Sequence, residues 1–145
     1  LLYDSGRQVE DKDVQILVRR ARDTSVFELV DNVGHRQSDK ALILLHRLLD
    51  EGEPPLQLLA MLARQVRILI QVSELREQGL PPKEMAARLK LHPYVVEKGL
   101  AQSKKFEMTQ LERAHQRLVE TDWSIKTGSM EPVLALDLLV TQLTS

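Results

Sequence analysis

Residues 54–79 read PPLQLLAMLARQVRILIQVSELREQG, and this segment sets the expectation for the whole chain. Two prolines open it, and proline is tolerated in the first turn of a helix because the N–H groups there have no partner within the helix. Leucine, isoleucine and valine then recur every three or four residues over much of the circumference. Gly79, a residue type that often follows a last turn, ends the segment. We predict a long helix at the centre of a helical bundle.

The same helical period continues on both sides of this segment, and β-branched alternation is rare. We therefore predict an all-α fold in which one N-terminal helix precedes a bundle of about seven helices. Glycine, proline or a capping side chain marks each helix boundary. The predicted helices start at or next to Asp11, Ser25, Ser38, Pro54, Pro81, Pro93, Thr109 and Glu131.

We predict a domain boundary near Asp23 and Thr24. The helix before it carries an apolar face, which includes Val14 and Leu17, without a complete set of partners in this sequence. The helices after it can close around one core. Residues 1–23 are therefore expected to end another domain, and residues 24–145 to form the bundle. Because the sequence begins with Leu1 rather than methionine, we expect it to be part of a longer protein.

Composition and charge argue against several classes of protein. The chain has no cysteine, which excludes disulfides and thiolate metal sites and suits a reducing, cytoplasmic interior. A net charge of −1 lacks the basic excess of a dedicated duplex-DNA binder. No uninterrupted apolar run reaches the length of a membrane span, which is about 18 residues, so we expect no membrane association.

The sequence predicts no catalytic residue, no cofactor and no metal site. Its six glycines never approach the spacing of a phosphate-binding loop. Its four histidines show no three- or four-residue spacing that would place a pair on one helical face. A small helical hydrolase or metal enzyme is the second alternative function, and clustered titrating groups or a bound metal would identify it.

The first alternative function is a DNA-binding regulator built on residues 82–105. This segment predicts two short helices joined at Leu91-His92-Pro93, which resembles a helix-turn-helix. We prefer an ordinary helical hairpin inside a bundle, because proline opens the second helix and the turn lacks arginine or asparagine for reading bases. The polar face that would contact DNA consists of Lys98, Gln102, Lys104 and Lys105.

Three groups of residues are candidates for a subunit interface. Arginine in a narrow polar stripe can bind carboxylates in bidentate pairs. Tryptophan is enriched at interfaces. The last helix carries more apolar residues than a single core-facing stripe would hold. Trp123 could equally be a core residue, and Lys126 is expected to pair with Asp122 four residues earlier. The candidates are Arg64, Arg67, Gln71, Trp123, Lys126, Leu136, Leu139, Val140 and Leu143.

The order of motifs resembles the C-terminal part of delta subunits of bacterial DNA polymerase III clamp loaders. The resemblance covers nearly the whole chain, departing from the usual apolar pattern only at Asp31-Asn32-Val33-Gly34. The motifs that carry it are Ser25–Asp31, Ala41–Pro55, Leu62–Arg67, Leu89–Lys98 and Asp122–Gly128.

This resemblance implies the remnant of a AAA+ lid domain, residues 1–23, followed by a collar domain, residues 24–145. It implies a non-catalytic scaffold role in chromosomal replication, with the collar packed against the gamma or tau motor subunits and delta-prime. It also implies that the sliding clamp is contacted only through an N-terminal domain absent from this sequence. Contact of the collar with DNA stays open.

Overall fold

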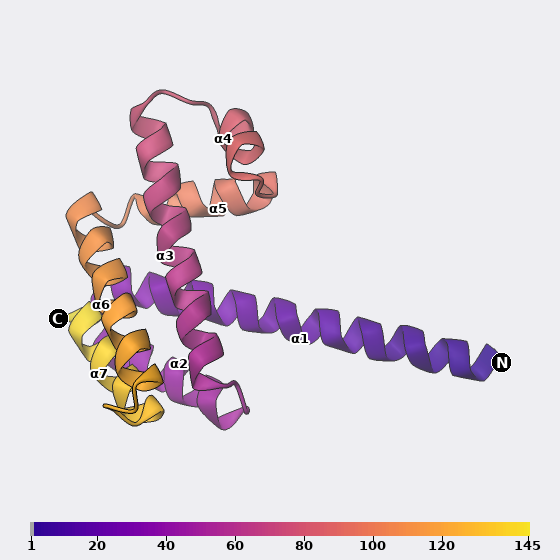
Figure 1. The fold of residues 1–145 in the computed structure, drawn as a ribbon. Helices are drawn as coiled ribbons and strands as arrows, with labels where there is room; N and C mark the ends of the chain where they lie inside the picture. Colours follow the sequence, from indigo (N-terminus) through magenta and orange to yellow (C-terminus); the bar gives the residue numbers. More distant parts are fainter. Residues whose placement is uncertain (1) are drawn as a thin grey trace.

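The computed structural model describes the backbone of residues 2–145 and the side chains of residues 12–145. Leu1, with which the predicted lid remnant begins, lies outside the described residues. The described part is all-helical, without strands, which confirms the predicted fold class (Figure 1). Its helices are α1 (Leu2–Gly34), α2 (Ser38–Asp50), α3 (Pro55–Glu77), α4 (Pro82–Leu89), α5 (Pro93–Ser103), α6 (Met108–Lys126) and α7 (Pro132–Thr144).

Helix α3 is the central helix, as predicted. It packs against α1, α5, α6 and α7, and Gly79 follows it with a φ of 81° that suits glycine. By length and composition alone α3 could cross a membrane. All of its leucines and valines except Leu56 are buried, however, while Arg64 and Arg67 are exposed. These features make α3 the core helix of the bundle.

Two apolar clusters meet along α3. The larger one joins α3 to the C-terminal part of α1 and to α2, α6 and α7. The smaller one joins the last turns of α3 to α4 and α5 through Ile68, Val72 and Met85. Gly99 lets α5 approach α3 closely, because a Cβ atom there would lie 3.2 Å from Ile68 Cγ2. The hairpin of α4 and α5 therefore has its own small core on one end of the central helix (Figure 1).

Helix α1 corrects the prediction of two separate N-terminal helices. It begins before Asp11 and runs without interruption through Ser25 to Gly34. No glycine or proline lies between Gly6 and Gly34, so nothing in the backbone forces a break. Serine can cap a helix only where its own backbone has non-helical φ and ψ angles. The two predicted helices are therefore one, whose N-terminal half extends away from the bundle (Figure 1).

The start of α6 also differs from the prediction. The helix begins at Met108, and Gln110 Oε1 accepts a hydrogen bond of 2.8 Å from the backbone N–H of Glu107. Thr109 is thus inside the first turn instead of capping it. Glu107 and Gln110 form a capping box, in which each side chain accepts a hydrogen bond from the backbone N–H of the other residue.

Candidate functional site

The polar stripe on α3 lies at the surface. Arg64, Arg67 and Gln71 are all exposed. No ion pair joins the two arginines to any carboxylate among the side chains of residues 12–145. The guanidinium groups therefore remain free to pair with carboxylates outside this chain.

The apolar candidates on α7 need correction. Leu136, Leu139 and Val140 are completely buried in the core of this chain, and Leu143 is partly buried against it. A partner cannot reach the first three without unfolding the helix. The opposite face of α7 instead exposes Leu134 and Leu138, which are 51% and 42% exposed. Because α7 is apolar around much of its circumference, its sequence did not show which apolar residues would face inward.

Helix α6 presents a second exposed apolar pair. Trp123 is 70% exposed, so the prediction that it could be a core residue is wrong. Val119, four residues earlier on the same helical side, is 53% exposed. Lys126 Nζ lies 2.9 Å from Asp122 Oδ2, which confirms that predicted pair. Sequence analysis missed Val119, although its spacing from Trp123 was the available signal.

These side chains belong to two helices that pack against each other. We call Val119 and Trp123 of α6 and Leu134 and Leu138 of α7 the α6–α7 apolar set. Isolated exposed leucines are ordinary, but several large apolar side chains on adjoining helices are typical of a protein interface. The set is therefore the strongest candidate for a docking surface on the bundle.

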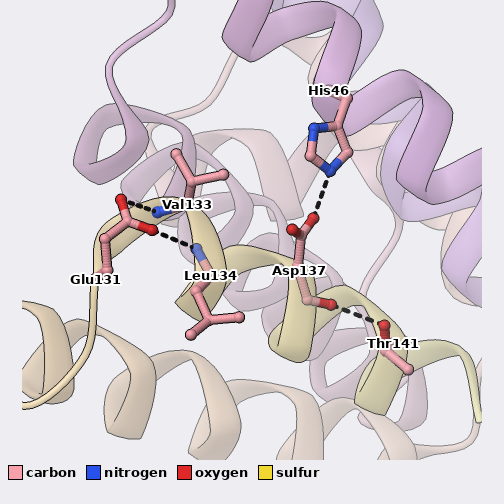
Figure 2. A network of polar contacts seen from close by, with 6 residues as sticks. All are labelled: His46, Glu131, Val133, Leu134, Asp137 and Thr141. Atoms are coloured by element: carbon pink, nitrogen blue, oxygen red, sulfur yellow. Dashed lines mark hydrogen bonds and ion pairs between the residues drawn. The ribbon is translucent and has the colours of Figure 1, made fainter.

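Polar contacts hold α7 in place beside this set (Figure 2). The carboxylate of Glu131 accepts hydrogen bonds from the N–H groups of Val133 and Leu134, at 3.1 and 2.9 Å. These two bonds stabilise the charged form and lower the pKa of the Glu131 carboxyl. His46 Nε2 of α2 lies 2.6 Å from Asp137 Oδ1, and Leu134 points away from this pair. The start and the middle of α7 are thus both anchored.

Gln102 of α5 does not face solvent as the DNA-binding alternative requires. Its side chain is 1% exposed. Its amide donates hydrogen bonds of 3.0 Å to Phe27 O and to Asp31 Oδ1, and it accepts one of 2.9 Å from Gln65 Nε2. Gln102 therefore joins α5 to α1 and α3, and the prediction that it contacts DNA is wrong.

Asp31 also forms an ion pair with Lys105, one of the lysines predicted to contact DNA. Lys105 Nζ lies 2.7 Å from Asp31 Oδ1. Burial, the largest single influence, acts to raise the pKa of the Asp31 carboxyl, but the hydrogen bonds from Lys105 and Gln102 together hold that pKa below its usual value. Of the four predicted DNA contacts, Lys98 and Lys104 remain exposed and without an ion pair among the described side chains.

Comparisons with known proteins agree with this architecture. The family model described as DNA polymerase III delta subunit, C-terminal domain, matches residues 23–143. The DNA polymerase III subunit delta of Bacillus subtilis (strain 168) is 31% identical over 131 residues, which are 90% of this chain and 38% of that protein. The solved structure of the Bacillus subtilis DNA clamp loader delta protein has a TM-score of 0.83 and 31% identity, and the match covers 92% of this chain and 39% of that one.

The chain therefore spans about two-fifths of the length of each of these relatives. The family model covers the bundle, from the last turns of α1 through α7. It names the same family as the sequence motifs did. On the family model and the two relatives together, the chain belongs to the family of DNA polymerase III delta subunits, as their C-terminal part.

Proposed function

We propose that this chain is a non-catalytic scaffold domain of a clamp-loader delta subunit, acting in the cytoplasm during chromosomal replication. The α6–α7 apolar set is the observation that carries this proposal. A ring of different subunits needs surfaces on each domain that pack against unlike neighbours. Exposed tryptophan and leucine on a rigid helical pair suit such packing, because a few large apolar side chains supply most interface energy.

The neighbours in this proposal are the gamma or tau motor subunits and delta-prime. The exposed arginines of α3 offer a second face, on which Arg67 would meet a carboxylate of a neighbour. The sliding clamp would be contacted through a part of the protein outside this chain. The DNA-binding alternative is weakened because Gln102 is buried and Lys105 is paired with Asp31.

Helix α1 supports the proposed division into a lid remnant and a collar. Its residues 12–24 are exposed apart from the half-buried Arg22, whereas Val26, Leu29 and Val30 are buried in the bundle. The exposed half carries Val14, Leu17 and Val18, which are more than half exposed. We assign residues 1–23 to the last lid helix, whose apolar face would pack against the rest of the lid.

Replacing Trp123 with alanine tests the scaffold role. The substitution should weaken association with the motor and delta-prime subunits by about tenfold or more, because a central tryptophan typically contributes about 2 kcal/mol or more to an interface. The measurement is co-purification of the chain with both partner subunits from the same source. Ile43→Ala is the matched control, since Ile43 on α2 is 70% exposed, as Trp123 is, and belongs to neither α6 nor α7.

Charge reversal at Arg67 tests the second face in the same assay, with Lys83→Glu on α4 as its control. Arg67→Glu should weaken assembly, whereas Lys83→Glu should leave it intact. Full assembly of Trp123→Ala and of Arg67→Glu, with unchanged helical content, would refute the proposed docking faces.

A further inference from the structure

A cleft of about 720 Å³ lies between α1, α3 and α5. None of these three helices carries a residue of the α6–α7 apolar set. Its inner surface is apolar, formed by Val26 and Phe27 of α1, Met61 of α3 and Val95 of α5. The volume is within the range of clefts that bind small ligands or a few side chains of a partner. The cleft can therefore accept an apolar group of limited size.

Cations surround this apolar floor. Arg20, Arg22, Arg64 and Lys98 line the cleft, and Asp23 is its one acidic lining residue. Only Arg22 has an ion pair among the side chains of residues 12–145, at 3.5 Å from Glu53. The other three cations outnumber Asp23, so the cleft has a net positive potential over an apolar surface, which attracts anionic groups.

One of these cations is already held at the cleft. Lys98 Nζ lies 5.1 Å from the centre of the Phe27 ring and 5.2 Å from that of Tyr94, so cation–π attraction holds the ammonium group there. Arg22 is instead paired with Glu53, and its Nε atom is buried, so a ligand in the cleft would not reach that atom directly.

We propose that this cleft binds a segment of a partner protein in which an apolar side chain is flanked by carboxylates. The apolar floor would bury the apolar side chain, and Arg20, Arg64 and Lys98 would pair with the carboxylates. This combination suits a protein segment better than a nucleic-acid backbone, whose phosphates gain nothing from Val26 or Met61. The proposal depends on the cleft alone and holds whether or not the α6–α7 apolar set docks a subunit.

Fluorescence anisotropy of the full chain with a labelled peptide tests this proposal. The probe is a fluorescein-labelled decapeptide with a central leucine–phenylalanine pair and four glutamates on each side. We expect saturable binding that weakens as salt is raised, because the ion pairs are partly exposed. A control peptide with glutamine in place of glutamate should bind at least about tenfold more weakly, since charged hydrogen bonds are roughly twice as strong as neutral ones.

Substitutions in the chain locate the binding. Arg64→Gln and Lys98→Gln should each reduce affinity for the acidic peptide by about five- to tenfold, through loss of a charge-assisted contact. Lys104→Gln is the matched control, because Lys104 is exposed at the end of α5 but does not line the cleft. All three variants should keep the helical circular dichroism of the parent chain, because the three side chains are exposed.

Three outcomes would overturn the proposal. One is the absence of saturable binding of the acidic peptide. Another is equal binding of the glutamine peptide, or equal binding by the cleft variants and the control variant. The third is displacement of the peptide by an oligothymidylate at concentrations below those of unlabelled peptide, which would assign the cleft to phosphates instead.

Discussion

Asp31 is the single residue on which the contacts between α1 and α5 depend most. It accepts hydrogen bonds from Gln102 and Lys105, and it lies in the segment where the sequence departs from the usual apolar pattern of the family. An acidic residue at this position is therefore explained by Gln102 of α5 and by Lys105, which follows that helix. Periodicity could not reveal this, because the partners are more than 70 residues apart.

The lowered pKa of Asp31 predicts an acid-dependent loss of stability. A carboxyl whose pKa is lower in the folded state stabilises the protein above its unfolded-state pKa, and this contribution disappears as the pH falls through the folded-state value. Asp31→Asn should reduce the free energy of unfolding by about 1 kcal/mol at pH 7, since the lost charged contacts are partly exposed. The difference from the parent chain should shrink as the pH falls below about 4.

Urea unfolding at several pH values measures this difference. Asp50→Asn is a suitable control, because Asp50 is exposed and makes no ion pair with any described side chain. A constant difference between Asp31→Asn and the parent chain from pH 7 to pH 3 would contradict the assigned role of Asp31.

At the scale of single helices, most boundaries were predictable because they depend on local chemistry. Gly52, Gly79 and Gly128 follow helix ends and Gly34 is the last residue of α1, while proline occupies the first turn of α3, α4, α5 and α7. The predicted break at Ser25 failed for a physical reason. Serine and aspartate favour a helix start but do not prevent a helix from continuing.

The orientation of helical faces was only partly predictable. On α5 the mostly polar face was assumed to point outward, yet Gln102 points inward, because three partners satisfy its amide. On α7 apolar residues occur on both sides, so only tertiary packing separates the buried Leu136 from the exposed Leu134. The arginine stripe of α3 was predictable because Arg64, Arg67 and Gln71 follow one another at three- and four-residue spacing.

Gln102 should therefore hold α5 against α1 and α3. Gln102→Ala leaves the side chain of Gln65 and the carbonyl of Phe27 without these partners, so it should lower the free energy of unfolding by about 2–3 kcal/mol. Amide hydrogen exchange should accelerate in α5 more than in α6, because the hydrogen bonds of Gln102 join α5 to α1 and α3 and none of them reaches α6. Gln71→Ala, an exposed glutamine on α3, should change stability by less than about 0.5 kcal/mol.

Equal effects of Gln102→Ala and Gln71→Ala would contradict the described network. Acceleration of exchange throughout the chain, without preference for α5, would show that Gln102 supports the whole fold instead of one helix.

At the scale of the whole molecule, two apolar clusters share α3, and the N-terminal half of α1 extends beyond them (Figure 1). The all-α class followed from the sequence because the helical period is nearly continuous. The docking surface did not, because it depends on which apolar residues remain after the core has closed. The α6–α7 apolar set and the cationic cleft lie on different helices, α6 and α7 for the set and α1, α3 and α5 for the cleft.

Sedimentation velocity of the chain mixed with the motor and delta-prime subunits, its proposed partners, tests the proposed scaffold role most directly. The account predicts that the chain moves into a faster-sedimenting boundary with both partners, and that Trp123→Ala returns it to its own slow boundary. A chain that sediments alone at every mixing ratio, while the partners assemble with each other, would contradict the account.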